Sequence, residues 1–170
     1  MLRFPRPGTL LLVVAALGML ERPAWGQPPT LQIPRVSQPP RLEEFLNGGP
    51  RKSAGRVTEF RQREPGDGVP ASQETSAYLS YDDQNLYVVF VCRDEPGKVR
   101  AHMAKREQIS GDDVVGVVVD TFRDRRRAYT FTANALGIQL DGITTEGQGE
   151  DYTFDTLWHS EGRLTPEGFV

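Results

Sequence analysis

Residues 112–141 read DDVVGVVVDTFRDRRRAYTFTANALGIQLD, and this stretch carries the clearest secondary-structure signal in the chain. Residues 114–119 form a continuous apolar run that is rich in β-branched side chains, which is typical of a strand covered on both faces. Residues 128–133 alternate with period two, which indicates a strand with one buried and one open face. The charged segment 123–127 joins these strands, and an Asn- and Gly-containing turn leads to a third strand at Ile138. Three consecutive antiparallel strands therefore predict an all-β chain.

Turn signals recur about every ten residues from Thr75 onward, the spacing typical of an all-β sandwich or barrel. Residues 98–107 are ambiguous, and their neighbours favour a strand over a helix. We therefore expect an antiparallel β-sandwich that is jelly-roll-like. Its other predicted elements are one helical turn at 42–46, strands at 56–60, 75–81, 86–92 and 157–163, a loop at 147–153, and a strand that begins at Phe169.

The N-terminus predicts export. Residues 1–26 have the basic start, short apolar stretch and small residues near the end of a signal peptide, and we expect cleavage after Gly26. An uncleaved anchor is the alternative, although the apolar stretch is shorter than the roughly 20 residues of a membrane span. Residues 27–40 hold five prolines and predict an extended leader. The domain would then occupy 41–170 in the periplasm, on the cell surface or outside the cell.

The last predicted strand has only two residues before the sequence stops at Val170. A strand that short cannot pair usefully, and nothing after it would cover the exposed edge. We therefore expect the domain to be truncated, with a C-terminal region of the same protein as one partner.

Composition excludes several classes of partner and site. The chain has 23 acidic and 20 basic residues, and cleavage after Gly26 would remove three arginines but only one glutamate. This acidic balance argues against nucleic acid or an anionic membrane as the main partner. Cys92 is the one cysteine, which excludes an internal disulfide and a thiolate zinc site, and its apolar neighbours predict burial.

An ordered series of short motifs resembles the family 9 carbohydrate-binding module over roughly residues 38–170. A form with such motifs lies at the N-terminus of large bacterial surface or outer-membrane proteins. The motifs are PASQET (70–75), YDDQNLYV (81–88), GDDV (111–114), DTFRDRR (120–126), AY (128–129), NALG (134–137) and FDTLW (154–158).

The resemblance implies a β-sandwich that binds sugars, often the chain ends of plant polysaccharides such as xylan, and that frequently carries calcium. Such modules are commonly attached to secreted glycoside hydrolases such as xylanases. The chain departs from the family at residues 42–45, which read LEEF where relatives usually have a tryptophan. Better-known members hold sugar between two tryptophans, whereas residues 27–170 contain only Trp158.

Candidate carbohydrate-binding residues follow from the chemistry of sugars. Aromatic faces cover the apolar C–H surface of a sugar ring, while carboxylates, amides and guanidinium groups bind its hydroxyls. The alternatives are that the indole fills the core and that the arginine run is a solvated turn. The candidates are Trp158, Asp155, Tyr129, Arg106, Glu107 and Arg126.

Calcium needs six to eight oxygen ligands, which Asp-rich loops supply. The predicted metal ligands are Asp112, Asp120, Asp124 and Asp141. Catalysis has little support, because no pair of carboxylates stands out and neither His102 nor His159 lies near a nucleophile motif.

These observations predict an exported, non-catalytic module that binds polysaccharide or oligosaccharide and targets a larger protein to it. Two alternatives stay open. One is an interaction domain of an outer-membrane-associated protein whose sugar site has been lost. The other is the N-terminal part of a secreted glycoside hydrolase whose catalytic residues lie beyond Val170.

Overall fold

The computed structural model describes residues 30–47 and 53–170. The predicted signal peptide and the first three residues of the predicted leader lie outside this part of the chain. The elements belong to a compact unit, Leu31–Val170. They are η1 (Leu42–Glu44), a short 3-10 helix, and the strands β1 (Gly55–Val57), β2 (Thr75–Tyr81), β3 (Leu86–Arg93), β4 (Val114–Val119), β5 (Arg127–Asn134), β6 (Gln139–Thr145), β7 (Gly149–Asp151), β8 (Leu164–Thr165) and β9 (Gly168–Phe169).

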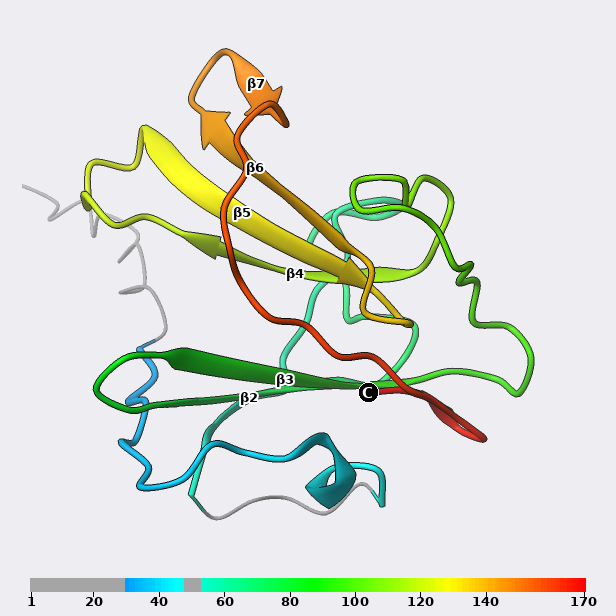
Figure 1. Cartoon of the computed structure of the whole chain (residues 1–170). Helices are drawn as coiled ribbons and strands as arrows, with labels where there is room; N and C mark the ends of the chain where they lie inside the picture. Colours follow the sequence, from blue (N-terminus) through cyan, green and yellow to red (C-terminus); the bar gives the residue numbers. More distant parts are fainter. Residues whose placement is uncertain (1–29, 48–52) are drawn as a thin grey trace, which may run out of the picture. The chain divides into compact units, whose positions relative to one another are not determined.

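The strands form two antiparallel sheets (Figure 1). One sheet has the order β1-β2-β3-β9-β8, and the other has the order β4-β5-β6-β7. In the second sheet, Val117 lies opposite Phe131, and Phe131 lies opposite Asp141. Opposed residues in antiparallel strands point to the same face, so these three side chains share one face of the sheet. The all-β prediction is confirmed for the described residues, and two antiparallel sheets are consistent with a β-sandwich.

Residues 75–81 and 114–119 are strands with the predicted bounds. The predicted strands at 98–107 and 157–163 are wrong, because neither segment joins a ladder. The backbone of the first segment instead makes separate bonds, such as Glu107 N–H to the carbonyl of Gln139 (2.7 Å). In the second segment, the Trp158 carbonyl accepts from Gln139 Nε2 at 2.9 Å, and Ser160 Oγ donates to the Gly137 carbonyl at 2.7 Å. The predicted loop at 147–153 contains the short strand β7.

The core consists of two small groups of buried residues. Phe45, which follows η1, packs against Tyr78 of β2 with ring centroids 5.2 Å apart. The second group contains Cys92 of β3, Phe169 of β9 and Ala135 after β5, with Val115 of β4 packed against it. This second group therefore joins the two sheets.

Burial determines the protonation state of the Cys92 thiol. Desolvation raises the pKa of Cys92 to about 11, so the group stays a neutral thiol at physiological pH. This agrees with the prediction that Cys92 serves as a small buried apolar residue.

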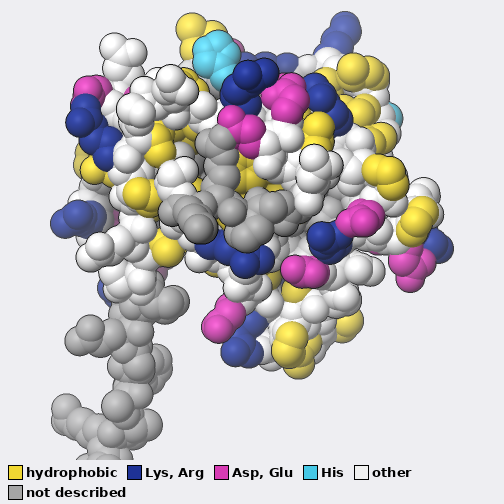
Figure 2. Space-filling model, turned by 90° about the horizontal axis from the view of Figure 1, so that it is seen from below, with side chains coloured by type: hydrophobic (Ala, Val, Ile, Leu, Met, Phe, Trp, Pro, Cys, Tyr) yellow, Lys and Arg dark blue, Asp and Glu magenta, His cyan; other side chains and the backbone are white. Residues whose placement is uncertain are grey.

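The leader meets the domain at the end of β2. Val36 N–H donates to the carbonyl of Tyr81, and Tyr81 N–H donates to the carbonyl of Pro34. The exposed side chains of Arg35 and Asp83 form an ion pair 2.5 Å apart beside this contact. The face seen from below Figure 1 carries acidic and basic side chains interspersed with apolar ones (Figure 2).

Gly168 makes the pairing of β9 with β3 possible. Its φ is +133°, and a Cβ atom placed there would overlap the carbonyl oxygen of Cys92 on β3. Gly97 also has positive φ (+77°), but a Cβ atom there would meet nothing within 4 Å. An alanine at Gly97 would suffer only backbone strain, whereas an alanine at Gly168 would also clash with β3. Comparing the two positions therefore distinguishes the two effects.

We expect Gly168→Ala to reduce the free energy of unfolding much more than Gly97→Ala. Gly97→Ala should cost about 1–2 kcal/mol, the strain of an alanine in left-handed backbone. Gly168→Ala should cost more, because the added methyl group forces β9 away from β3 and exposes Phe169. Urea denaturation of both variants measures the difference, and equal losses would contradict the role assigned to Gly168.

Candidate functional site

The candidate site is built around a buried ion pair. Arg106 Nη2 donates to Asp141 Oδ1 at 2.6 Å, and the Asp141 side chain is completely buried. The second carboxylate oxygen of Asp141 accepts the backbone N–H of Thr156 at 2.9 Å. Arg106 Nη1 donates to Gln139 Oε1 at 2.8 Å. A buried carboxylate requires such compensation, because removing it from water costs several kcal/mol.

The segment that follows β7 lies over the face of the sheet that bears Asp141. Figure 1 shows this segment, coloured orange to red, crossing the strands on its way to β9. Phe154 packs against Tyr129 with ring centroids 5.2 Å apart, and Trp158 packs edge-on against Phe131 at 5.5 Å. The two strand residues are two apart on β5, so alternation places both rings on this face.

Polar contacts fix the same segment to the sheet. Gln139 Nε2 donates to the Trp158 carbonyl at 2.9 Å, and Arg106 Nη2 donates to the Thr156 carbonyl at 2.7 Å. Asp155 Oδ1 lies 2.8 Å from Arg106 Nη2. We call Arg106, Gln139, Asp141, Asp155 and Trp158 the Arg106 cluster.

The Arg106 cluster combines buried and accessible groups. The side chain of Asp155 is 69% exposed and that of Arg106 is 32% exposed, while Trp158 is half-buried. The Nε–H of Arg106 and the indole N–H of Trp158 are buried and have no hydrogen-bond partner within the described chain. The cluster therefore offers a carboxylate, a guanidinium group and an indole at one place.

The structure brings half of the six predicted sugar-binding residues together. Trp158, Asp155 and Arg106 belong to the cluster. Tyr129 contacts Phe154 and lies two residues before Phe131, the aromatic partner of Trp158. Glu107 is exposed and takes part through its backbone N–H. Arg126 is exposed in the loop between β4 and β5, where its backbone N–H donates to Asp124.

Two members of the cluster were missed or assigned another role. Gln139 was not predicted, and Asp141 was predicted as a metal ligand, whereas Arg106 is the cation that faces it. The hairpin register carried a signal, because Asp141 lies opposite Phe131 and thus on the aromatic face.

The four predicted metal ligands do not form one coordination sphere. Asp112 and Asp120 flank β4 at opposite ends, about 20 Å apart for a strand of this length. Asp120 accepts the N–H groups of Phe122, Arg123 and Arg125, which fold the loop. In the described residues, no group of three or more His, Cys, Asp or Glu side chains gathers. These positions do not fit the calcium site that the family resemblance implies.

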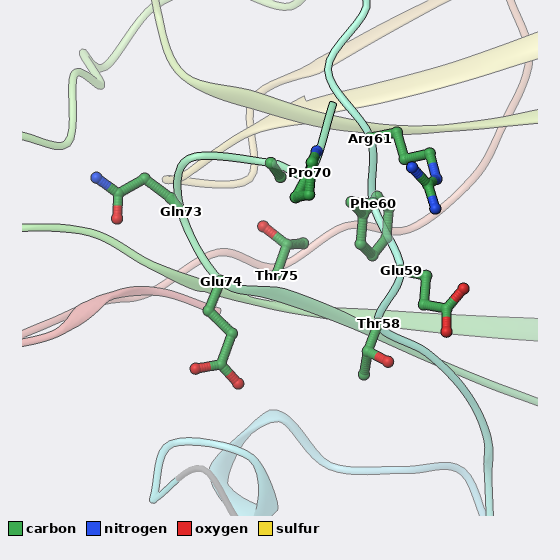
Figure 3. A pocket seen from close by; sticks show the side chains of 9 residues that line it. Thr58, Glu59, Phe60, Arg61, Pro70, Gln73, Glu74 and Thr75 are labelled. Atoms are coloured by element: carbon green, nitrogen blue, oxygen red, sulfur yellow. The ribbon is translucent and has the colours of Figure 1, made fainter. Parts of the chain in front are cut away.

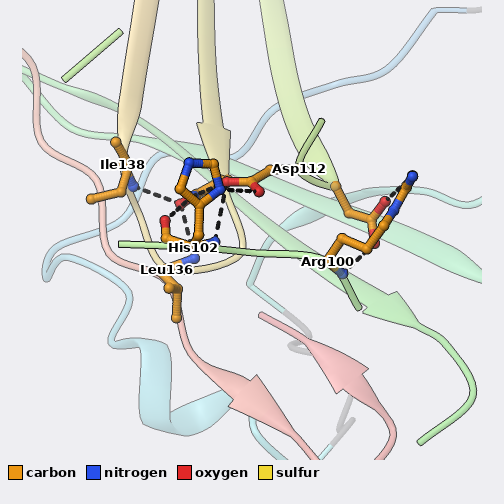
Figure 4. A network of polar contacts seen from close by, with 7 residues as sticks. Arg100, His102, Asp112, Leu136 and Ile138 are labelled. Carbon is orange, nitrogen blue, oxygen red and sulfur yellow. Dashed lines mark hydrogen bonds and ion pairs between the residues drawn. The ribbon is translucent and has the colours of Figure 1, made fainter. Parts of the chain in front are cut away.

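Asp112 instead belongs to a network with His102 and Asn134 (Figure 4). Its Oδ1 lies 2.6 Å from His102 Nδ1, and its Oδ2 accepts from Asn134 Nδ2 at 2.7 Å. Asn134 Oδ1 accepts the N–H groups of Leu136 and Ile138, which shapes the turn before β6. Burial has the largest single effect on the pKa of Asp112 and raises it, but the hydrogen bonds from Asn134 and His102 together lower the pKa by more. The pKa of Asp112 is therefore lowered.

Two hollows lie elsewhere on the described part of the chain. One, of about 220 Å³, is bordered by Phe60, Pro70 and Thr75 (Figure 3). Another, of about 630 Å³, lies beside Arg35 and Asp83. The Arg106 cluster lines neither of these two hollows.

The two carboxylates bound to Arg106 should differ greatly in their contribution to stability. We expect Asp141→Ala to cost about 2–3 kcal/mol, because it leaves the Thr156 N–H without its acceptor and removes the fully buried acceptor of Arg106. Asp155→Ala removes an exposed partner of the same Nη2 atom and should cost about 1 kcal/mol or less. Urea denaturation of the two variants provides the comparison. Similar losses would show that Asp141 does not hold the segment to the sheet.

Acid should weaken the Asp112 network. A carboxyl whose folded pKa lies below its unfolded value of about 3.9 stabilises the fold above that pH. This stability is lost as the pH falls through the folded pKa. In Asp112→Asn, the urea midpoint should therefore depend less steeply on pH below about 4. An unchanged acid slope would contradict the role of Asp112.

Comparisons with known proteins returned no match. No protein-family model matches the chain, no curated protein matches it, and no solved structure matches it. In residues 30–47 and 53–170, no helix has the length and apolar character needed to cross a membrane. The function proposed below therefore depends on the residues and their geometry.

Proposed function

We propose that the domain is an exported, non-catalytic carbohydrate-binding module that targets a larger protein to polysaccharide. The observation that carries this proposal is the exposed carboxylate of Asp155, ion-paired to Arg106 beside the half-buried indole of Trp158. The family resemblance supports the same function, since its motifs include residues 154–158.

Binding would use two kinds of contact. The accessible part of the Trp158 indole covers the apolar C–H face of a sugar ring, burying area at low entropic cost. Asp155 and Arg106 exchange hydrogen bonds with sugar hydroxyls, and such charge-assisted bonds are stronger than neutral ones. Asp155 is suited to this because most of its side chain is exposed. The substrate class is oligosaccharides of plant polysaccharides, such as xylo- and cello-oligosaccharides.

Export is part of the proposal. Residues 1–26 have the composition of a signal peptide, and the mature protein would begin at Gln27. The product would then act in the periplasm, on the cell surface or outside the cell.

The engagement of Arg106 favours a second candidate, an interaction domain without a sugar site. Its guanidinium group already contacts Gln139, Asp141, Asp155 and the Thr156 carbonyl. A group with four such partners can act solely to hold the covering segment to the sheet. The two candidates differ in whether Asp155 has a role beyond stability.

Calorimetric titration with xylo- and cello-oligosaccharides tests the proposal. Asp155→Asn should weaken binding about tenfold or more, the loss of one charge-assisted hydrogen bond. Trp158→Phe should also weaken binding, because the smaller ring keeps contact with Phe131 but covers less of the sugar.

Asp83→Asn is the matched control, since it removes an equally simple exposed ion pair, with Arg35. Its affinity should equal that of the wild type. Wild-type protein that binds none of these sugars, or equal affinities for Asp155→Asn and the wild type, would favour the interaction domain.

A further inference from the structure

The two sheets have four outer edges in the described part of the chain, and β4 differs from the other three. β1 has three residues including Arg56, β7 has three including two acids, and β8 has two residues. Short strands and charges are the usual protection of a sheet edge against pairing with another chain. β4 reads VVGVVV and has neither.

The outer edge of β4 is free of backbone partners within the described residues. β4 pairs with β5 on one side, and no other described segment hydrogen-bonds to the backbone of Val114–Val119. Arg100 covers the chain just before the strand, where its carbonyl accepts the N–H of Asp113. The backbone N–H and C=O groups on the outer edge of β4 that have no described partner therefore start at Val114.

The open face of β4 is apolar and accessible. Val114 is 46% exposed and Val118 is 65% exposed, and both point to this face. Phe122, in the loop after β4, is also 65% exposed. An unpaired edge that also exposes apolar side chains is suited to accept another strand.

The charged residues that flank β4 favour one orientation when β4 pairs with a second copy of itself. Before the strand, the carboxylates of Asp112 and Asp113 are already bound to His102 and Arg100, whereas the loop after the strand has an excess of basic side chains. Antiparallel pairing of β4 with β4 of a second copy keeps the two basic loops at opposite ends of the pair. Parallel pairing would set like charges together. The charged residues are Asp112 and Asp113 before β4, and Asp120, Arg123, Asp124, Arg125, Arg126 and Arg127 around the loop.

We propose that β4 pairs antiparallel with β4 of a second copy of this chain, which joins the two β4–β7 sheets into one continuous sheet. Strand alternation restricts the register, because residues of the same face must lie opposite each other. The register centred on Gly116 places Val114 of each copy opposite Val118 of the other. The two exposed valines of each chain are then covered, and Gly116 leaves room at the centre. This pairing does not depend on sugar binding.

Sedimentation analysis over a range of concentrations, using the protein from Gln27 to Val170, tests the proposal. The wild type should form a concentration-dependent dimer. Val118→Lys should raise the dimer dissociation constant about tenfold or more, because it places a charge in the paired face. Leu86→Lys is the matched control, since Leu86 is also an exposed strand residue (49%) but lies on β3. Its dissociation constant should be that of the wild type.

Disulfide trapping tests the register. Cys92 is the one native cysteine and is buried, so it contributes little background. The variant V114C/V118C should form disulfide-linked dimers under mild oxidation, whereas V114C and V118C alone should form few.

A wild type that stays monomeric at about 1 mM overturns the proposal. Equal effects of Val118→Lys and Leu86→Lys also overturn it. Trapping that is as efficient in the single variants as in V114C/V118C overturns the Gly116-centred register.

Discussion

The buried pair of Arg106 and Asp141 is the interaction on which the β4–β7 sheet and its covering segment depend. Asp141 is sealed from solvent on the aromatic face of the sheet, so it requires a cation and further donors. Arg106 supplies the charge from the chain between β3 and β4, and Thr156 supplies an N–H from the chain after β7. Two segments without strand pairing of their own are thereby held to one face, which positions Trp158 and Asp155.

Local patterns in the sequence predicted the strands but not what covers them. Residues 75–81 and 114–119 were predicted with the observed bounds, because alternation and β-branching act over a few residues. The segment at 98–107 was predicted as a strand because its neighbours favoured one, and the segment at 157–163 because it lies between recurring turn signals. Side chains from distant parts of the chain hold them instead, and Arg106 and Asp141 are 35 residues apart. Asp141 was accordingly assigned to a metal, since its counter-ion could not be identified from spacing.

The proposed sugar site shares Arg106 with the ion pair that holds the covering segment to the sheet. The members of the Arg106 cluster therefore have different roles. Asp141 and Gln139 are turned toward the protein, whereas Asp155 is largely exposed and contacts the same guanidinium group. Trp158 lies between these roles, because its indole N–H is buried whereas the residue as a whole is half-buried. Binding at such a site would be restrained by the need to keep Arg106 paired with Asp141. The edge of β4 involves none of these residues, so assembly and ligand binding can be separated.

The Trp158 indole is the most direct probe of the site, since residues 27–170 contain no other tryptophan. Its N–H gives a single indole resonance in a ¹H–¹⁵N correlation spectrum of the protein that begins at Gln27. Titration with xylo- or cello-oligosaccharides should shift this resonance progressively, along with those of Arg106 and Asp155. An indole resonance that stays unchanged at saturating sugar, in a protein that remains folded, would contradict the assignment of the Arg106 cluster as a carbohydrate site.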